Sequence, residues 1–143
     1  MRWASLALRT QPKRNGESLP VLRTGVDLIE VGRIARAAQR HGERFYQRFF
    51  TEAERAYCGT HFPALAARFA AKEAVAKALG TGIGDIRWVD IEVSHDAHGR
   101  PVLNLYGAAA QLAAELGLTE WAISLAHTHD HAIAFVVAMG GSG

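Results

Sequence analysis

The segment from Arg68 to Gly80 constrains the fold more than any other stretch of this chain. It is built almost entirely of strong helix formers, and Gly80 stands where a helix C-terminal cap belongs. Continued back to Phe62, the helical pattern carries two phenylalanines on one face, so we expect that face to point inward. Steps of three and four residues back from Lys77 define that face, which carries Glu73, Phe69, Ala66 and Phe62.

The same inward face holds a carboxylate and an ammonium, Glu73 and Lys77, one helical turn apart. Burying both charges costs desolvation free energy unless another interaction offsets it. Two explanations remain open. The residues form either an ordinary i,i+4 ion pair at the rim of the core, or part of a site in which a bound cation and an anionic ligand compensate the buried charges.

The size and charge of the chain exclude several classes of protein. With 143 residues, of which 49% are hydrophobic, it is long enough for one domain with a sizeable core. The formal net charge of +2 is small, and no Lys-rich run indicates nucleic acid binding. No apolar run is long enough to cross a membrane. The single cysteine, Cys58, excludes an intrachain disulfide and indicates a reducing, cytoplasmic location.

The N-terminal residues show no strong pattern. A short apolar patch is followed by three basic residues and the turn-like pair Asn15-Gly16, which is too weak for a secretory signal. We expect residues 1–18 to form a flexible extension, and residues 19–140 to form a single domain.

Residues Leu19 to Ile29 read as a strand, because aliphatic and β-branched residues alternate along them. Asp27 interrupts this pattern, although aspartate is depleted in strands. Gly25, two residues earlier, allows another group to approach the backbone closely. Asp27 is therefore either the turn residue that starts the next helix or a metal ligand at a strand end.

A helical pattern begins at Val31, and Gly42 is expected to divide it into two helices. Arginines recur along it at spacings of three, four, four and four, at Arg33, Arg36, Arg40, Arg44 and Arg48. Such a stripe is either a solvated face or a docking surface for an acidic protein. Only Glu43 lies nearby to neutralise the arginines, which favours docking.

The remaining chain alternates between short helices and strands. Thr51 and Glu54 form a capping box that starts a helix running to about Cys58. The glycines from Gly80 to Gly84 follow a helix rather than precede one, so we interpret them as a cap and loop and not as a phosphate cradle. A hairpin, a helix and a last pair of strands follow, at Trp88–Ser94 with Pro101–Tyr106, Gly107–Leu116, Trp121–Ala126 and Ala132–Met139.

The joint between the last two strands is rich in histidine. His127, His129 and His131 alternate, so their imidazoles fall on one side of an extended chain and form a candidate zinc site. No thiolate or tight HxxxH spacing accompanies them, and exposed histidines are common in hairpin turns. Both readings stay open.

Two of these motifs together resemble the holo-acyl-carrier-protein synthase type of 4'-phosphopantetheinyl transferase. The first runs from Gly25 to Val31, and the second runs from Arg68 to Ala74 and continues from Lys77 to Ile83. Each motif alone is weak, but the two at this separation are specific. The sequence Ser124 to Thr128 is similar to a late-strand motif of that family. The resemblance extends in order from about Val21 to Met139.

This resemblance implies an α+β fold in which a small antiparallel sheet packs on a long helix with shorter helices around it. It implies an enzyme that transfers 4'-phosphopantetheine from coenzyme A to a serine of apo-acyl carrier protein and leaves adenosine 3',5'-bisphosphate. The carrier would serve fatty acid biosynthesis or polyketide synthesis. Short members of this family are similar to one another in forming homotrimers with sites at the subunit interfaces, so the resemblance also implies a trimer.

The resemblance also implies roles for individual residues. Asp27 and Glu73 would be the ligands of Mg²⁺, which suits a hard cation that keeps several waters and takes other ligands from phosphate. Lys77 would contact a phosphate oxygen, and the base would be Glu73 or a metal-bound water. Implied contacts with coenzyme A come from Arg68, Lys77, His127 and Thr128. Implied contacts with the acidic carrier protein come from Arg33, Arg40 and Arg44.

This chain departs from the family pattern in two places. Residues 1–18 have no counterpart in the short type, and His131 stands where a tyrosine is common. A competing hypothesis is a non-catalytic module that binds coenzyme A or an acidic protein. The sequence contains no Ser-His-Asp order or Rossmann fingerprint that would identify another enzyme class.

Overall fold

The computed structural model describes residues 13–14, 17–18, 20–81 and 86–141. It contains one three-stranded antiparallel sheet in the order β3-β7-β6, and two smaller pairs, β1-β2 and β4-β5. The strands are β1 Lys13–Arg14, β2 Glu17–Ser18, β3 Val21–Glu30, β4 Ile91–His95, β5 Pro101–Leu105, β6 Glu120–His127 and β7 His131–Gly140. The helices are α1 Val31–His41, α2 Glu43–Phe49, α3 Glu52–Cys58, α4 Phe62–Leu79, the 3₁₀ turn η1 Trp88–Asp90, and α5 Gly107–Glu115.

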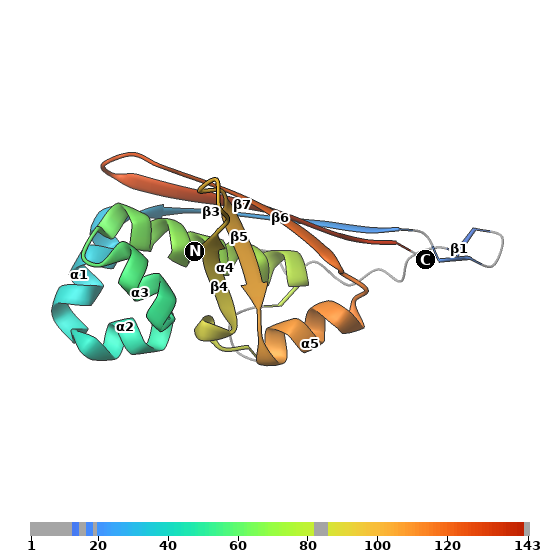
Figure 1. The fold of residues 1–143 in the computed structure, drawn as a ribbon, viewed down its shortest axis with the longest axis horizontal. Helices are drawn as coiled ribbons and strands as arrows, with labels where there is room; N and C mark the ends of the chain where they lie inside the picture. Colours follow the sequence, from blue (N-terminus) through green and yellow to red (C-terminus); the bar gives the residue numbers. More distant parts are fainter. Residues whose placement is uncertain (1–12, 15–16, 19, 82–85, 142–143) are drawn as a thin grey trace.

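Helix α4 is the centre of the molecule. The sheet covers one side of it, helices α1 to α3 gather at its N-terminal end, and the β4-β5 hairpin lies against another side (Figure 1). Eight alanines in its sequence keep its side chains small, so neighbouring elements approach closely. The helix ends at Gly80, whose left-handed backbone caps the last turn as the sequence predicts.

Glycine 25 is where strand β3 meets α4 most closely. A Cβ atom on Gly25 would lie 1.8 Å from the carbonyl oxygen of Ala74, so only glycine fits there. The close approach that the sequence predicts at Gly25 is thus confirmed, and the approaching group is a helix backbone. Two residues further along the same face of the strand lies Asp27.

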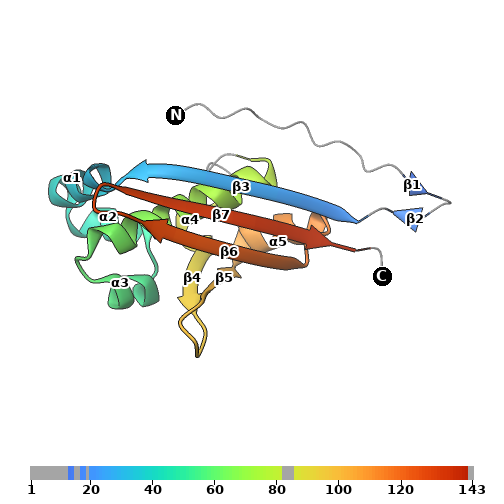
Figure 2. The ribbon, with the colours of Figure 1, turned by 90° about the horizontal axis from the view of Figure 1, so that it is seen from above.

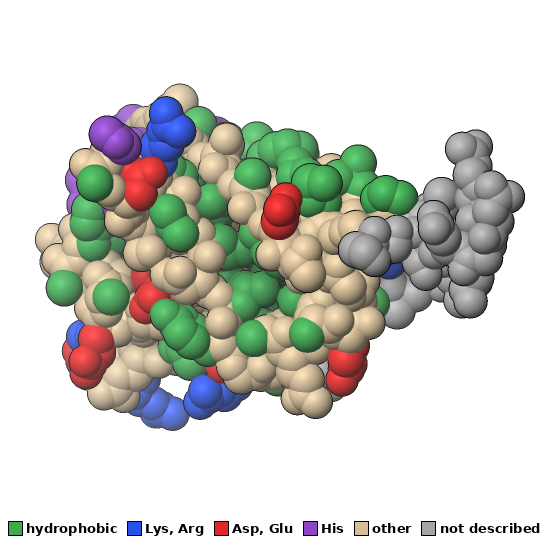
Figure 3. All heavy atoms as spheres, turned by 45° about the vertical axis from the view of Figure 1, so that its right-hand side comes forward, with side chains coloured by type: hydrophobic (Ala, Val, Ile, Leu, Met, Phe, Trp, Pro, Cys, Tyr) green, Lys and Arg blue, Asp and Glu red, His purple; other side chains and the backbone are tan. Residues whose placement is uncertain are grey.

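The three-stranded sheet has two different faces, because successive side chains of a strand alternate. The inner face packs on α4 through small residues such as Ala134 and Val136, which are fully buried. The outer face is apolar and open, with exposures between 39% and 65% at Leu22, Val26, Leu28, Ile133, Phe135 and Met139. Figure 2 shows the three strands from this open side, with α4 beneath them. Hydrophobic side chains are also prominent along the upper edge of Figure 3, where the sheet lies.

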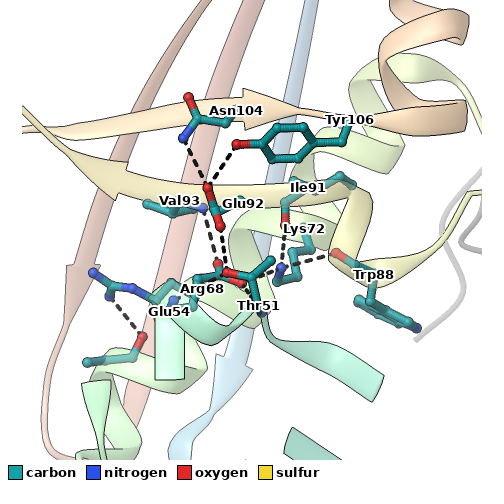
Figure 4. Close-up of polar contacts among 11 residues, drawn as sticks. Thr51, Glu54, Arg68, Lys72, Trp88, Ile91, Glu92, Val93, Asn104 and Tyr106 are labelled. Atoms are coloured by element: carbon teal, nitrogen blue, oxygen red, sulfur yellow. Dashed lines mark hydrogen bonds and ion pairs between the residues drawn. The ribbon is translucent and has the colours of Figure 1, made fainter. Parts of the chain in front are cut away.

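A buried ion pair joins α3 to α4. Lys72 Nζ lies 2.8 Å from Glu54 Oε1, and both side chains have no exposed surface. Lys72 also donates to the carbonyl oxygens of Trp88 and Ile91, while Glu54 accepts from the Val93 amide (Figure 4). Because the charges are paired and hydrogen-bonded on all sides, removing one partner would leave the other buried and uncompensated.

The α+β class and the order of elements agree with the sequence analysis. The helices at Val31, Thr51 and Phe62, the break at Gly42, the capping box at Thr51 and the last strand pair are confirmed. No helix in the described ranges is long and apolar enough to cross a bilayer.

Three expectations were wrong. Trp88–Asp90 is a 3₁₀ turn and not the start of a strand, because its residues pack between α2 and α5 and make no ladder. Asp27 does not start a helix, since it pairs with Ala134 inside the sheet and Glu30 is the N-cap of α1. The helix face with Glu73 and Lys77 is not the most buried one, because α4 is surrounded and that face is only half-buried.

The expectation for residues 1–18 lies largely outside the described residues. Only Lys13–Arg14 and Glu17–Ser18 are described there, as the short antiparallel pair β1-β2. Residues 82–85, which belong to the predicted glycine loop, also lie outside the described residues.

Candidate active site

Two acidic side chains from distant parts of the sequence meet beside α4. Asp27 comes from β3 and Glu73 from α4, and the contact at Gly25 holds these two elements against each other. Asp27 is 8% exposed, while Glu73 is half-buried. The structure therefore brings together the two carboxylates that the sequence singles out.

Burial raises the pKa of both acids. Desolvation raises the pKa of Asp27, and the hydrogen bond from Lys77 opposes this shift. Desolvation also raises the pKa of Glu73, and the nearby Asp27 carboxylate raises it further. The Asp27 carboxylate thus disfavours ionisation of Glu73, and a divalent cation would supply the positive charge that favours it.

Lys77 lies next to the acid pair. Its Nζ atom is 3.3 Å from Asp27 Oδ1 and donates to the carbonyl oxygen of Val26 at 2.8 Å. Arg33, at the start of α1, also lowers the pKa of both Asp27 and Glu73 by its positive charge. The acid pair is thus flanked by one lysine and one arginine, an arrangement suited to holding phosphate oxygens around a cation.

A basic groove of about 540 Å³ runs along α1 and α2, and Arg33 lies in it. Arg44 and Arg48 line the same groove with an apolar floor that includes Phe45, Phe49 and Phe69. Arg40 is exposed on α1 but does not line the groove. Two of the three predicted docking residues, Arg33 and Arg44, therefore share one groove, and the charge of Arg33 acts on the acid pair.

A second cavity, of about 780 Å³, opens on a different side of α4. Its polar lining includes Arg68 and His127, two of the predicted coenzyme A contacts, together with Tyr57, His61, His95 and Arg100. The ring of His127 contacts the ring of His61 at 5.9 Å. Thr128 does not line this cavity, because its hydroxyl accepts from the amides of Asp130 and His131 in the β6–β7 turn.

Arg68 is a buried cation without an anionic partner in the described part of the chain. It is 4% exposed, Nη1 donates to the Ala64 carbonyl at 3.0 Å, and Nη2 lies 3.0 Å from His95 Nε2. Its Nε atom has no hydrogen-bond partner. A buried guanidinium normally pairs with a carboxylate or phosphate, so this cavity suits an anion.

The two sites point in different directions. Arg68 and Glu73 are five residues apart on α4, which separates their directions by roughly 140° around the helix axis. Figure 4 shows the Arg68 guanidinium pointing away from the Lys72 network. One chain therefore presents the acid pair and the cationic cavity on separate faces.

The sequence analysis did not identify Tyr57, His61, His95 or Arg100. They come from α3, the N-cap of α4 and the β4–β5 hairpin, and no spacing in the sequence links them. Only the hairpin expected from Trp88–Ser94 and Pro101–Tyr106 gave a signal in this region, and that signal concerned local structure.

The three histidines of the last hairpin and the acid pair Asp27–Glu73 differ in how well they suit a metal ion. No group of three or more His, Cys, Asp and Glu side chains in residues 20–81 and 86–141 is arranged to hold a metal, so the zinc reading of His127, His129 and His131 gains no support. Mg²⁺ is commonly held by one or two carboxylates together with phosphates and waters. Asp27 and Glu73 fit that donor set.

The acid pair predicts a pH dependence of stability. A carboxyl whose pKa is raised by folding stabilises the fold at low pH, and this contribution is lost as pH rises through the folded pKa. Glu73→Gln should therefore raise the melting temperature at pH 7.5 in the absence of metal, and should abolish any rise caused by 10 mM Mg²⁺. Differential scanning fluorimetry from pH 4.5 to 8 measures both effects.

The control for this experiment is Glu115→Gln, a change of the same kind at an exposed position on α5. Its Mg²⁺ response should equal that of the wild type. A Glu73→Gln protein that keeps the full Mg²⁺ response would contradict the assignment of the acid pair.

Comparison with known proteins gives a consistent family. Residues 23–136 match the model of the 4'-phosphopantetheinyl transferase superfamily. A holo-[acyl-carrier-protein] synthase of Herpetosiphon aurantiacus is 53% identical over 127 residues, which cover 84% of this chain and 100% of that protein. One of Moorella thermoacetica is 50% identical over 117 residues, covering 80% and 91%.

Solved structures agree with the sequence relatives. The holo-[acyl-carrier-protein] synthase of Helicobacter pylori in complex with coenzyme A has a TM-score of 0.74 at 29% identity, covering 80% of this chain and 98% of that one. The enzyme of Neisseria meningitidis has a TM-score of 0.73 at 38% identity, covering 81% and 96%. This chain belongs to the 4'-phosphopantetheinyl transferase superfamily.

Proposed function

We propose that this protein transfers 4'-phosphopantetheine from coenzyme A to a serine of apo-acyl carrier protein, giving holo-acyl carrier protein and adenosine 3',5'-bisphosphate. The observation that carries the proposal is the pairing of Asp27 with Glu73 beside Lys77, next to a basic groove. Family membership and relatives named holo-[acyl-carrier-protein] synthase support the same reaction.

The reaction replaces the phosphoanhydride bond of the coenzyme A diphosphate by a phosphate ester of serine. The serine hydroxyl oxygen attacks the phosphorus that carries pantetheine, a new P–O bond forms, and the bond from that phosphorus to the bridging oxygen breaks. Adenosine 3',5'-bisphosphate leaves with the bridging oxygen, and the hydroxyl proton passes to Glu73 or to water. Lys77 holds a phosphate oxygen as a point charge, which stabilises charge in the transition state.

We assign Asp27 and Glu73 as the residues that hold Mg²⁺. When bound, Mg²⁺ neutralises charge on the diphosphate and orients it for in-line attack. The support comes from this chain alone: both carboxyl groups are at least half-buried, burial raises the pKa of each, and the Asp27 charge raises the pKa of Glu73 further, so the pair is short of positive charge. Asp27 and Lys77 also sit within ion-pair distance, so Lys77 is held in place before the substrate arrives.

We assign the arginines of α1 and α2 to docking of the carrier protein. Arg33, Arg40 and Arg44 are exposed, and no acidic side chain in the described part of the chain forms an ion pair with them. Arg33 and Arg44 line one groove, and the charge of Arg33 acts on Asp27. An acidic carrier docked there would present its serine close to Asp27 and Glu73.

We further propose a homotrimer with shared sites. The outer face of the sheet exposes six large apolar side chains in one area, which a partner subunit would cover. In addition, Arg68 and His127 face away from the acid pair of the same chain. A single coenzyme A molecule that contacts both sets would lie between the acid pair of one subunit and the cationic cavity of the next.

The first test is the reaction itself. Incubation with coenzyme A, Mg²⁺ and apo-acyl carrier protein should add the mass of one phosphopantetheine group to the carrier, as read by intact mass spectrometry. Asp27→Asn and Glu73→Gln should each lower kcat/KM by about a hundredfold or more, since several kcal/mol of charge stabilisation are lost. Coenzyme A binding without any mass gain in the wild type would instead support the non-catalytic binding module.

The second test concerns the arginines. Replacing Arg40 and Arg44 together by Gln, and then by Glu, should raise the KM for the carrier in two steps, by about tenfold or more for the Glu pair. The KM for coenzyme A should stay within about twofold of the wild type, and the salt dependence of the carrier KM should decrease. An unchanged carrier KM in the Glu pair would contradict docking at this surface.

The third test concerns sharing of the site between subunits. Glu73→Gln and Arg68→Ala proteins, each impaired alone, are unfolded, mixed in equal amounts and refolded together. If each site takes Glu73 from one subunit and Arg68 from its neighbour, about a quarter of the sites in random trimers are intact. Activity should recover to about that fraction. No recovery in a mixture that light scattering shows to be trimeric would place both residues in one chain's site.

A further inference from the structure

The cavity around Arg68 contains an arrangement that the proposed reaction does not by itself explain. The guanidinium of Arg68 lies 4.8 Å from the ring of Tyr57, and the rings of Tyr57 and His95 stack at 4.2 Å with an angle of 21°. His95 in turn contacts the guanidinium at 3.0 Å. Three side chains from α3, α4 and β4 therefore contact one another in a closed triangle.

The chemistry of this triangle fixes the state of His95. An arginine nitrogen can only donate a hydrogen bond, so His95 Nε2 must be the acceptor in its contact with Arg68 Nη2. His95 is therefore neutral, with its proton on Nδ1. Burial and the positive charge of Arg68 lower the pKa of His95, while Asp96 opposes this shift, and neutral His95 is favoured.

The triangle leaves part of the hydrogen-bonding capacity of Arg68 unused. Nη1 is used by the Ala64 carbonyl and Nη2 by His95, while Tyr57 covers a face of the guanidinium. Nε has no hydrogen-bond partner, although Arg68 is only 4% exposed. A charged group held on two sides and unsatisfied on the third is pre-organised for an anion.

We propose that Tyr57 and His95 are positioning residues that orient Arg68 toward a phosphate of the coenzyme A substrate. This inference rests on the proposed function, because the ligand is taken from that reaction. Neither residue needs to touch the reacting atoms. Tyr57 fixes the plane of the guanidinium, and neutral His95 fixes its rotation by accepting from Nη2.

The surroundings of His95 fit this role. Its neighbours are Asp96, which follows it at the end of β4, Arg68 from α4 and Tyr57 from α3. Across the cavity lie the positively charged Arg100 and two further histidines, His61 and His127. The cavity thus offers the guanidinium groups of Arg68 and Arg100 to an anion, and His95 is held as an acceptor by Arg68 rather than by a carboxylate.

The experiment compares variants that keep or remove the acceptor. His95→Ala removes it, His95→Gln keeps a side-chain oxygen able to accept from Arg68, and His129→Ala is the matched control at an exposed turn outside the cavity. His95→Ala should raise the KM for coenzyme A about tenfold with kcat within about twofold. His95→Gln should recover most of the loss, and His129→Ala should equal the wild type.

Tyr57 is tested in the same way. Tyr57→Phe keeps the ring under the guanidinium and should retain the wild-type KM for coenzyme A, whereas Tyr57→Ala should raise it severalfold. Coenzyme A carries phosphate both in its diphosphate and on the ribose 3' position. If Arg68 binds the 3'-phosphate, the His95→Ala loss disappears with 3'-dephospho-coenzyme A, and if it binds the diphosphate, the loss persists.

The two proposals fail in different ways. The first possible result is that the wild type transfers phosphopantetheine and His95→Ala has an unchanged KM for coenzyme A and an unchanged melting temperature. This result would overturn the positioning role and leave the proposed reaction intact. A wild-type protein that transfers nothing would overturn the reaction. In that case, titration calorimetry with adenosine 3',5'-bisphosphate still tests the positioning role. We expect this ligand to bind His95→Ala about tenfold more weakly than the wild type. Equal binding to both proteins would overturn the positioning role.

Discussion

The contact between Gly25 and Ala74 is the constraint on which the proposed site depends. It allows the backbone of β3 to lie directly against the backbone of α4, with no side chain between them. Asp27 then reaches the side of the helix that carries Glu73 and Lys77. Any larger residue at position 25 would separate strand from helix and would move the two carboxylates apart. The small residue is therefore as important to the chemistry as the acids themselves.

The buried pair of Lys72 and Glu54 fixes α4 from the opposite direction. It ties the helix to α3, to β4 and to the turn at Trp88, so that α4 has little freedom to rotate. Rotation would exchange the half-buried position of Glu73 with the fully buried position of Lys72, its neighbour in sequence. An ion pair in such a position is costly to desolvate, and its value here lies in the specific orientation that it imposes.

The sequence predicted the elements and the acid pair because both have local signals. Gly25 and Asp27 stood out as unusual residues within a strand pattern, and Glu73 stood out as a charge on a helix of alanines. The direction of the Glu73 face was wrong, because a helix packed on nearly every side has no single inward stripe. The triangle of Tyr57, Arg68 and His95 could not be predicted, since its members meet only through the packing of α3 and the β4–β5 hairpin on α4.

The side chains of strand β3 point alternately to the two faces of the sheet, and this links the proposed active site to the proposed subunit interface. Asp27 points to the helix, and its neighbours Val26 and Leu28 point to the open apolar face that we assign to the trimer. A slip of one residue in the pairing with β7 would turn Asp27 to the outside and bring Val26 against Lys77 and Glu73. The register that buries the carboxylate is thus the same register that exposes the association surface. If a neighbouring subunit supplies the cationic cavity around Arg68, β3 has two roles. It positions Asp27 on one face, and its other face binds the subunit that brings this cavity to the acid pair.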